Sequence, residues 1–195
     1  MNIYTIGDSH SHSTIKNFTR NFHLGPVTMF RVGRDGFQAF PQLQNVPNDG
    51  LVLLSFGEID IRCHVYNQIK IQGLDIDSVL RSLVDKYKQS IIEFSKIQIG
   101  ILGIPPPCRY VPKKNNPAYP FVGSDEERLE YTLKMNILLE AMCTENKWIF
   151  VNVYPKYCDA DGFLVEYLSD GNVHIANASF AQESLQNICL RLEKI

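Results

Sequence analysis

The sequence lacks a long hydrophobic run, a block of basic residues and any internal repeat. No apolar stretch approaches the roughly 20 residues that a membrane-spanning helix needs. The apolar start, residues 1–6, is too soon interrupted for a signal peptide. The net charge is −2 with both signs mixed along the chain, so nucleic acid is not an expected partner. These absences predict a protein with no membrane span, and they leave its oligomeric state open.

The cysteines also lack a pattern. Five are present, an odd number, and none forms a C-x-x-C pair. Such spacing argues against a disulfide framework and against a zinc site, and it is typical of reduced thiols. We therefore expect a cytoplasmic protein. The positions are Cys63, Cys108, Cys143, Cys158 and Cys189.

What the chain does have is an alternation of short apolar runs with longer amphipathic stretches. With 195 residues, 45% of them hydrophobic, it is long enough for one domain, 1–195, with a full core. Continuous apolar runs closed by Gly or Pro predict strands buried in a parallel sheet, and apolar residues at helical spacing predict helices between them. The expected fold is a three-layer α/β/α domain. Strands are expected at 2–6, 27–32, 51–56, 97–104 and 148–153, and helices at 75–94, 124–146 and 177–192.

Polar or Gly-rich clusters follow the first three of these runs and precede the last helix. They occupy residues 7–13, 33–36, 57–64 and 170–174. In open α/β sheets, ligands bind beyond the carboxyl ends of the strands, so these clusters are expected around one crevice.

Three side chains in these clusters suggest nucleophilic catalysis. A serine such as Ser9 is a weak nucleophile unless a base takes its proton, and His174 is the candidate base. Asp170 is the candidate that orients the imidazole. Each residue also has a simpler interpretation, because Ser9 can cap a helix and Asp170 can start an ordinary turn. Gly33 and Gly36 could offer amides to an oxyanion, or they could serve only as turn residues.

Taken together, the four clusters resemble a known family. Gly7-Asp8-Ser9 resembles the GDS block of the SGNH/GDSL-like hydrolases, and Gly36 lies where that family places an oxyanion-hole glycine. The segment from Gly57 to Asp60 resembles the G-x-N-D block, and the segment from Asp170 to His174 resembles the terminal D-x-x-H block. All four blocks come in the family's order.

This resemblance implies a flavodoxin-like fold of about five parallel strands, with no metal and no cofactor. Members of the family are esterases, lipases, thioesterases, carbohydrate deacetylases and some acyltransferases. The resemblance assigns Ser9 as the nucleophile, His174 as the base and Asp170 as the third member of a triad. The backbone amides of Ser9 and Gly36 would hold the oxyanion.

The sequence departs from the family pattern in two places. Ile59 stands where the family has an asparagine that donates to the oxyanion, so we hypothesise that Arg62 replaces it, with His64 as another nearby candidate. Asp170 precedes His174 by four residues instead of three, which leaves a Ser-His dyad as an alternative. The run Gly-Glu-Ile-Asp-x-Arg resembles a variant branch of the family that is associated with surface polysaccharide.

Other residues are expected to line the crevice or to have a structural role. A Pro-rich stretch, 104–120, suggests either a lid or sugar-binding wall, or a stiff surface loop. His10, His12 and His64 do not match a zinc signature, so no metal is expected. Nothing in the sequence places Glu58, Asp60 or Glu166 as a glycosidase acid pair. The predicted substrate-binding residues are Asp8, His10, Gly57, Glu58, Asp60, His64, Arg109 and Tyr110.

The sequence thus predicts a serine esterase that removes a short acyl group, such as acetyl, from a small molecule or carbohydrate. An acyltransferase with the same site is a close variant. A catalytically inactive domain that binds a glycan or a protein is the alternative that Ile59 favours. A nucleotide-binding module is disfavoured, because the turn after the first strand has no P-loop lysine.

Overall fold

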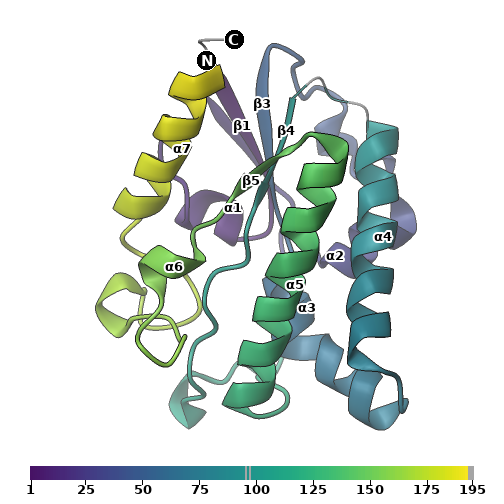
Figure 1. Ribbon diagram of the computed structural model, residues 1–195, viewed down its shortest axis with the longest axis vertical. Coiled ribbons are helices and arrows are strands. Elements are labelled where there is room, and N and C mark those ends of the chain that lie inside the picture. The colour runs from purple at the N-terminus through teal and green to yellow at the C-terminus, as the bar shows by residue number, and fades with distance from the viewer. Residues whose placement is uncertain (95, 97, 193–195) are drawn as a thin grey trace.

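The computed structural model describes residues 1–94, 96 and 98–192, and it contains a fully parallel five-stranded sheet (Figure 1). The strand order is β2-β1-β3-β4-β5, which is the flavodoxin-like order. This confirms the predicted three-layer fold. The strands are β1 (Asn2–Gly7), β2 (Arg20–His23), β3 (Gly50–Ser55), β4 (Gln98–Leu102) and β5 (Ile149–Val151).

Helices cover both faces of the sheet. In Figure 1, α4 and α5 lie on one side of the strands and α7 on the other. The α-helices are α1 (His10–Ser13), α2 (Met29–Asp35), α3 (Glu58–Asp60), α4 (Ile76–Phe94), α5 (Asp125–Asn146), α6 (Tyr154–Tyr157) and α7 (Ser179–Leu192). Two π-helical turns, Ile61–Val65 and Asn67–Ile71, follow α3. Short 3₁₀ turns cover Phe37–Ala39, Pro41–Leu43, Pro112–Lys114 and Glu166–Leu168.

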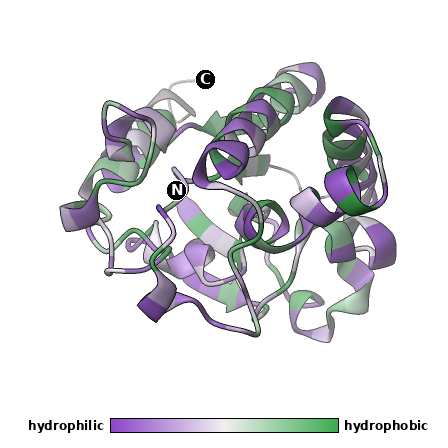
Figure 2. Ribbon diagram, turned by 90° about the horizontal axis from the view of Figure 1, so that it is seen from below, coloured by the Kyte–Doolittle hydropathy of each residue, from purple (hydrophilic) through white to green (hydrophobic). Residues whose placement is uncertain are grey.

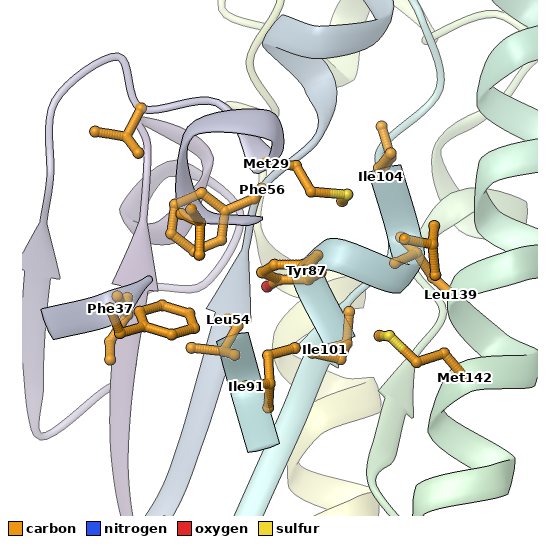
Figure 3. Close-up of a cluster of buried hydrophobic side chains, with 14 of the residues drawn as sticks. Met29, Phe37, Leu54, Phe56, Tyr87, Ile91, Ile101, Ile104, Leu139 and Met142 are labelled. Carbon is orange, nitrogen blue, oxygen red and sulfur yellow. The ribbon is translucent and has the colours of Figure 1, made fainter. Parts of the chain in front are cut away.

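The sheet separates two hydrophobic cores. Val52 and Leu54 of β3 pack into the core beneath α4 and α5, whereas Leu51 and Leu53 pack into the core beneath α7. This is the alternation that a strand buried on both faces requires. Aromatic rings fill the first core around Tyr87 of α4 (Figure 3). Figure 2 shows hydrophobic and hydrophilic residues interleaved along the helices, and α4 buries Val79, Leu80, Val84, Tyr87 and Ile91 on one of its sides.

The predicted strand at 27–32 was wrong. Residues 29–35 form α2, whose first turn is capped by Thr28, which accepts from the Arg31 amide at 3.1 Å. The second strand is instead β2, an edge strand of four residues in which only Phe22 is buried. A short apolar run does not distinguish a buried helix from a strand, and a polar edge strand has no apolar run to detect.

The other predicted elements agree closely with the structure. The expected capping box at the start of α5 is present, with Ser124 accepting from the Glu127 amide and Glu127 accepting from the Ser124 amide. The predicted strand at 97–104 begins at a residue outside the described part, and β4 covers Gln98–Leu102. Among the described residues, no helix combines the length and the apolar character that a membrane crossing needs.

Candidate active site

Ser9 lies in the tight turn between β1 and α1. The turn is close to β3, since a Cβ on Gly7 would come within 2.1 Å of the Ser55 carbonyl oxygen. Only glycine fits at this point of the chain. The turn therefore places Ser9 at the carboxyl end of the sheet.

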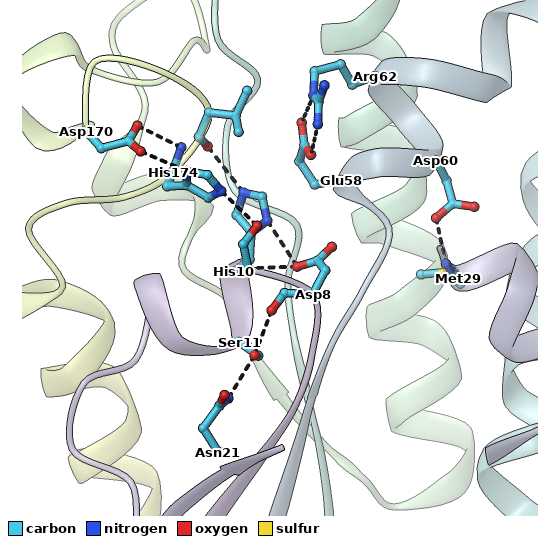
Figure 4. Close-up of polar contacts among 12 residues, drawn as sticks. Asp8, His10, Ser11, Asn21, Met29, Glu58, Asp60, Arg62, Asp170 and His174 are labelled. Carbon is cyan, nitrogen blue, oxygen red and sulfur yellow. Dashed lines mark hydrogen bonds and ion pairs between the residues drawn. The ribbon is translucent and has the colours of Figure 1, made fainter. Parts of the chain in front are cut away.

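The structure brings His174 within hydrogen-bonding distance of both Ser9 and Asp170, and Figure 4 shows the His174 ring next to Asp170. His174 Nε2 lies 2.8 Å from Ser9 Oγ, and His174 Nδ1 lies 2.8 Å from Asp170 Oδ2. A carboxylate at Nδ1 favours the tautomer with its proton there, which leaves Nε2 free to accept the serine proton. The arrangement has the geometry that nucleophilic activation of a serine requires.

The Asp170 carboxylate bonds both the His174 ring and the backbone of the turn between the two residues, although they are four positions apart. Asp170 Oδ1 accepts hydrogen bonds from the amides of Asn172 and His174 at 2.8 and 3.2 Å. Partial burial alone would raise the pKa of Asp170, but the hydrogen bond from His174 and that from the Asn172 amide lower it below its usual value. Asp170 therefore stays ionised while it faces the imidazole.

A cavity of about 270 Å³ opens over Ser9 and His174. Its polar side chains come from several loops, and the Pro-rich stretch that was expected to overhang the crevice contributes two of its residues. The lining residues are Ser9, His23, Gly25, Pro26, Ile59, Arg62, Asn116, Tyr119, Phe121, Asn172, Val173 and His174.

Several solved structures that are named as lipolytic proteins or esterases superpose on this chain. A GDSL-like lipase from Bacteroides thetaiotaomicron superposes with a TM-score of 0.63 at 14% identity, over 99% of this chain and 88% of the other. A lipolytic protein of the G-D-S-L family from Veillonella parvula superposes with a TM-score of 0.56 at 15% identity, over 97% of this chain and 98% of the other. An acetyl xylan esterase, AlAXEase, superposes with a TM-score of 0.57 at 11% identity, over 96% of this chain and 99% of the other. No family model and no curated protein matches the sequence.

The chain has the GDSL-like hydrolase fold. At these identities the likeness concerns the fold, so the roles of individual residues depend on the geometry of this site.

The structure places Gly36 away from the position expected for it. Gly36 follows α2, and its amide already donates to the Val32 carbonyl at 2.8 Å. The residue that follows β2 and lines the cavity is Gly25, which has a φ of +75°. Among the described residues, none accepts a hydrogen bond from the amide of Gly25 or of Ser9. Within the GDSL-like fold, Gly25 is therefore the better candidate for the oxyanion site, and the misplaced strand explains why the sequence did not reveal it.

Ile59 and Arg62 both line this cavity. Arg62 is almost fully buried, and Glu58 holds it by a two-pronged ion pair, with Nε 2.6 Å from Oε1 and Nη2 3.0 Å from Oε2. Its Nη1 donates to the Tyr119 carbonyl. These contacts engage three of the five N–H groups that a guanidinium carries. Arg62 is thus fixed in the wall of the cavity, and its other N–H groups remain available to donate hydrogen bonds.

Two other residues of the same segment face away from Ser9. Asp60 and His64 border a second cavity of about 520 Å³ that lies between α2 and α4. Asp60 accepts from the amides of Met29 and Phe30 at 2.7 and 3.0 Å, so its role is to hold the start of α2. Burial raises the pKa of Asp60 to about 7, although these amides oppose the shift. Gly57 turns the chain with a φ of +113°, where a Cβ would meet Ile104.

The remaining candidates lie outside the lining of the first cavity. Asp8 and His10 are buried next to the site. Arg109 pairs with Asp159 and Asp161 at 3.3 and 2.7 Å, and the half-exposed Tyr110 is fixed through its amide to Asp125. Within the part of the chain that the structure describes, no cluster of three or more His, Cys, Asp or Glu side chains could hold a metal ion.

Sequence reasoning missed several residues of the cavity. The sequence offered a weak signal for two of them, because Asn116 and Tyr119 belong to the Pro-rich stretch that was expected to overhang the crevice. The others depend on how loops distant in sequence meet. The missed residues are His23, Gly25, Pro26, Asn116, Tyr119 and Phe121, whereas Asn172 and Val173 lie in the 170–174 cluster that was expected at the crevice.

Proposed function

We propose that the protein is a serine esterase that removes a short acyl group, such as acetyl, from a carbohydrate. The observation that carries the proposal is the line of hydrogen-bonding contacts from Ser9 Oγ through His174 to Asp170, beneath a cavity in a GDSL-like fold. The fold alone does not assign an activity, but a serine in this environment is the group that acyl transfer needs.

The proposed reaction has two halves. Ser9 Oγ attacks the ester carbonyl carbon as His174 Nε2 takes the hydroxyl proton, and the tetrahedral oxyanion is held by the amides of Ser9 and Gly25. The intermediate collapses, and His174 returns the proton to the leaving alcohol. Water then attacks the acyl-Ser9 ester with His174 again acting as base, which releases the acid and restores the hydroxyl.

The lining of the cavity supports a carbohydrate as the alcohol. Tyr119 and Phe121 provide aromatic surface, while Asn116 and Asn172 are neutral side chains that both donate and accept hydrogen bonds. The charge of Arg62 is balanced by Glu58, so the wall does not select strongly for an anionic substrate. A structural neighbour that acts on acetylated xylan is consistent with this choice.

The size of the cavity predicts a preference for short acyl groups. At about 270 Å³ it lies just below the usual range for small-molecule sites, so a sugar leaves little room for a long chain. We expect kcat/KM for p-nitrophenyl acetate to exceed that for the decanoate by about tenfold or more. The assay is initial-rate hydrolysis, with Ser9→Ala as the control for background, followed by acetate release from acetylated xylan oligosaccharides. A preference for the decanoate would contradict the proposed substrate class.

A further inference from the structure

His10 has an unusual environment for a buried histidine. It follows Ser9 directly, and only 2% of it is exposed. Both ring nitrogens face oxygen atoms, with Nδ1 3.2 Å from Asp8 Oδ1 and Nε2 3.3 Å from the Val173 carbonyl oxygen (Figure 4). A carbonyl and a carboxylate only accept hydrogen bonds, and a neutral imidazole has one N–H to donate. With Asp8 as a carboxylate, only the imidazolium form of His10 satisfies both contacts.

The second of these contacts fixes the backbone next to the base. The Val173 carbonyl belongs to the same peptide unit as the His174 amide, and that amide donates to Asp170 Oδ1 at 3.2 Å. The peptide unit that leads into His174 is therefore held at its oxygen by His10 and at its nitrogen by Asp170. The rings of His10 and His174 also lie against each other, with centroids 4.9 Å apart.

We propose that His10 is a buried imidazolium that positions His174, by tying the peptide before the base to the turn that carries Ser9. This role rests on the proposed esterase function. Because His10 does not line the cavity over Ser9 and would act through His174, it is a positioning residue. Asp8 completes the link by accepting both the ring N–H of His10 and its backbone amide, the latter at 2.9 Å.

The charges around His10 support the same protonation state. Asp8 precedes it in the turn, Glu58 faces it from α3, His174 faces it from the 170–174 loop, and His12 follows it in α1. The neighbouring backbone of 55–56 and 102–105 brings no titratable side chain. Burial lowers the pKa of His10, but attraction to Asp8 and Glu58 and the hydrogen bonds outweigh it and raise the pKa to about 9.

The raised pKa of His10 predicts how the stability of the protein changes with pH. A histidine whose pKa rises on folding, from 6.5 to about 9, adds stability that is fully present below pH 6.5 and is lost as the pH rises through about 9. The stability of the wild type relative to His10→Phe should therefore be largest in mild acid. Esterase activity should decline on the alkaline side as His10 loses its proton.

The direct test reads the ring nitrogens of His10 by NMR in ¹⁵N-histidine-labelled full-length protein, with His10→Gln to assign the signals. We expect both nitrogens to carry protons at neutral pH and one to lose its proton near pH 9. A neutral ring at neutral pH would overturn the proposal, whether or not the protein hydrolyses esters.

The functional test uses His10→Phe, which keeps a ring and removes both donors, and His10→Gln, which keeps one amide donor. We expect kcat for p-nitrophenyl acetate to fall about 10²-fold in His10→Phe, with KM within about threefold of wild type, because misplacement of a catalytic group chiefly affects the chemical step. The kcat of His10→Gln should lie between the values for the wild type and for His10→Phe. The decline of activity near pH 9 should disappear in both variants.

The matched control is His12→Gln, the same exchange two residues further along α1, where the ring packs edge-on against His23. It should retain kcat within about threefold. Full kcat in a folded His10→Phe protein would overturn the positioning role. A folded wild type that hydrolyses no ester would overturn the esterase proposal and the positioning role with it, while the charge of His10 would still be measured.

Discussion

Replacing His174 by glutamine is expected to lower kcat for p-nitrophenyl acetate by at least about 10⁴-fold. Glutamine keeps a polar group near Ser9 Oγ but cannot accept and return a proton, so both halves of the reaction lose their general base and acid. Because His174 lies at the edge of the cavity and not in either hydrophobic core, the thermal stability should change little.

The same exchange at His12 provides the control for the loss of an imidazole in this region. If His174→Gln retained more than about a tenth of the wild-type kcat, a base other than His174 would have to activate Ser9. That result would reduce the 2.8 Å contact between His174 Nε2 and Ser9 Oγ to a structural hydrogen bond.

Removing the Arg62 guanidinium together with the charge of its partner is expected to lower kcat by about 10²–10³-fold, the usual cost of one oxyanion donor. We propose that a remaining N–H group of Arg62 donates to the oxyanion. It would replace the side-chain amide of the family's asparagine, which Ile59 lacks. The single change Arg62→Gln would leave Glu58 buried without its cation, which typically costs about 3–5 kcal/mol of stability. The double variant Arg62→Gln/Glu58→Gln avoids this penalty, because it removes both charges.

A third substitution makes this experiment specific. Adding Ile59→Asn to the double variant places an amide donor at the cavity wall, and we expect it to restore about tenfold or more of the lost kcat. Unchanged kcat in the folded double variant would show that Arg62 only shapes the wall.

The parts of the fold that could be predicted from the sequence are those whose cause is local. Residues 51–56 form a continuous apolar run because β3 is buried on both faces, and the run identifies the strand. The helix at 125–146 shows its start through the Ser124–Glu127 box. β2 gave no such signal, since an edge strand of four mostly polar residues is held by pairing with β1 rather than by its own burial.

The residues of the candidate site also differ in whether a local sequence signal could identify them. Ser9, Asp170 and His174 lie in short segments with recognisable spacing, and the structure brings them together as the motifs suggested. Gly25 could not be found, because its place depends on where β2 ends, and an error in one strand shifted the expected glycine to Gly36. Arg109 and Tyr110 were expected at the crevice because the loop follows β4, but contacts with Asp159, Asp161 and Asp125 fix them elsewhere.

The measurement that tests the central claim most directly is labelling with a fluorophosphonate, followed by the intact mass of the wild type and of Ser9→Ala. An activated serine attacks phosphorus and keeps the phosphonyl group as fluoride leaves, so we expect one adduct per wild-type chain and none in Ser9→Ala. A folded wild type that stays unlabelled, or a Ser9→Ala protein that labels equally well, would contradict the assignment of Ser9 as the nucleophile.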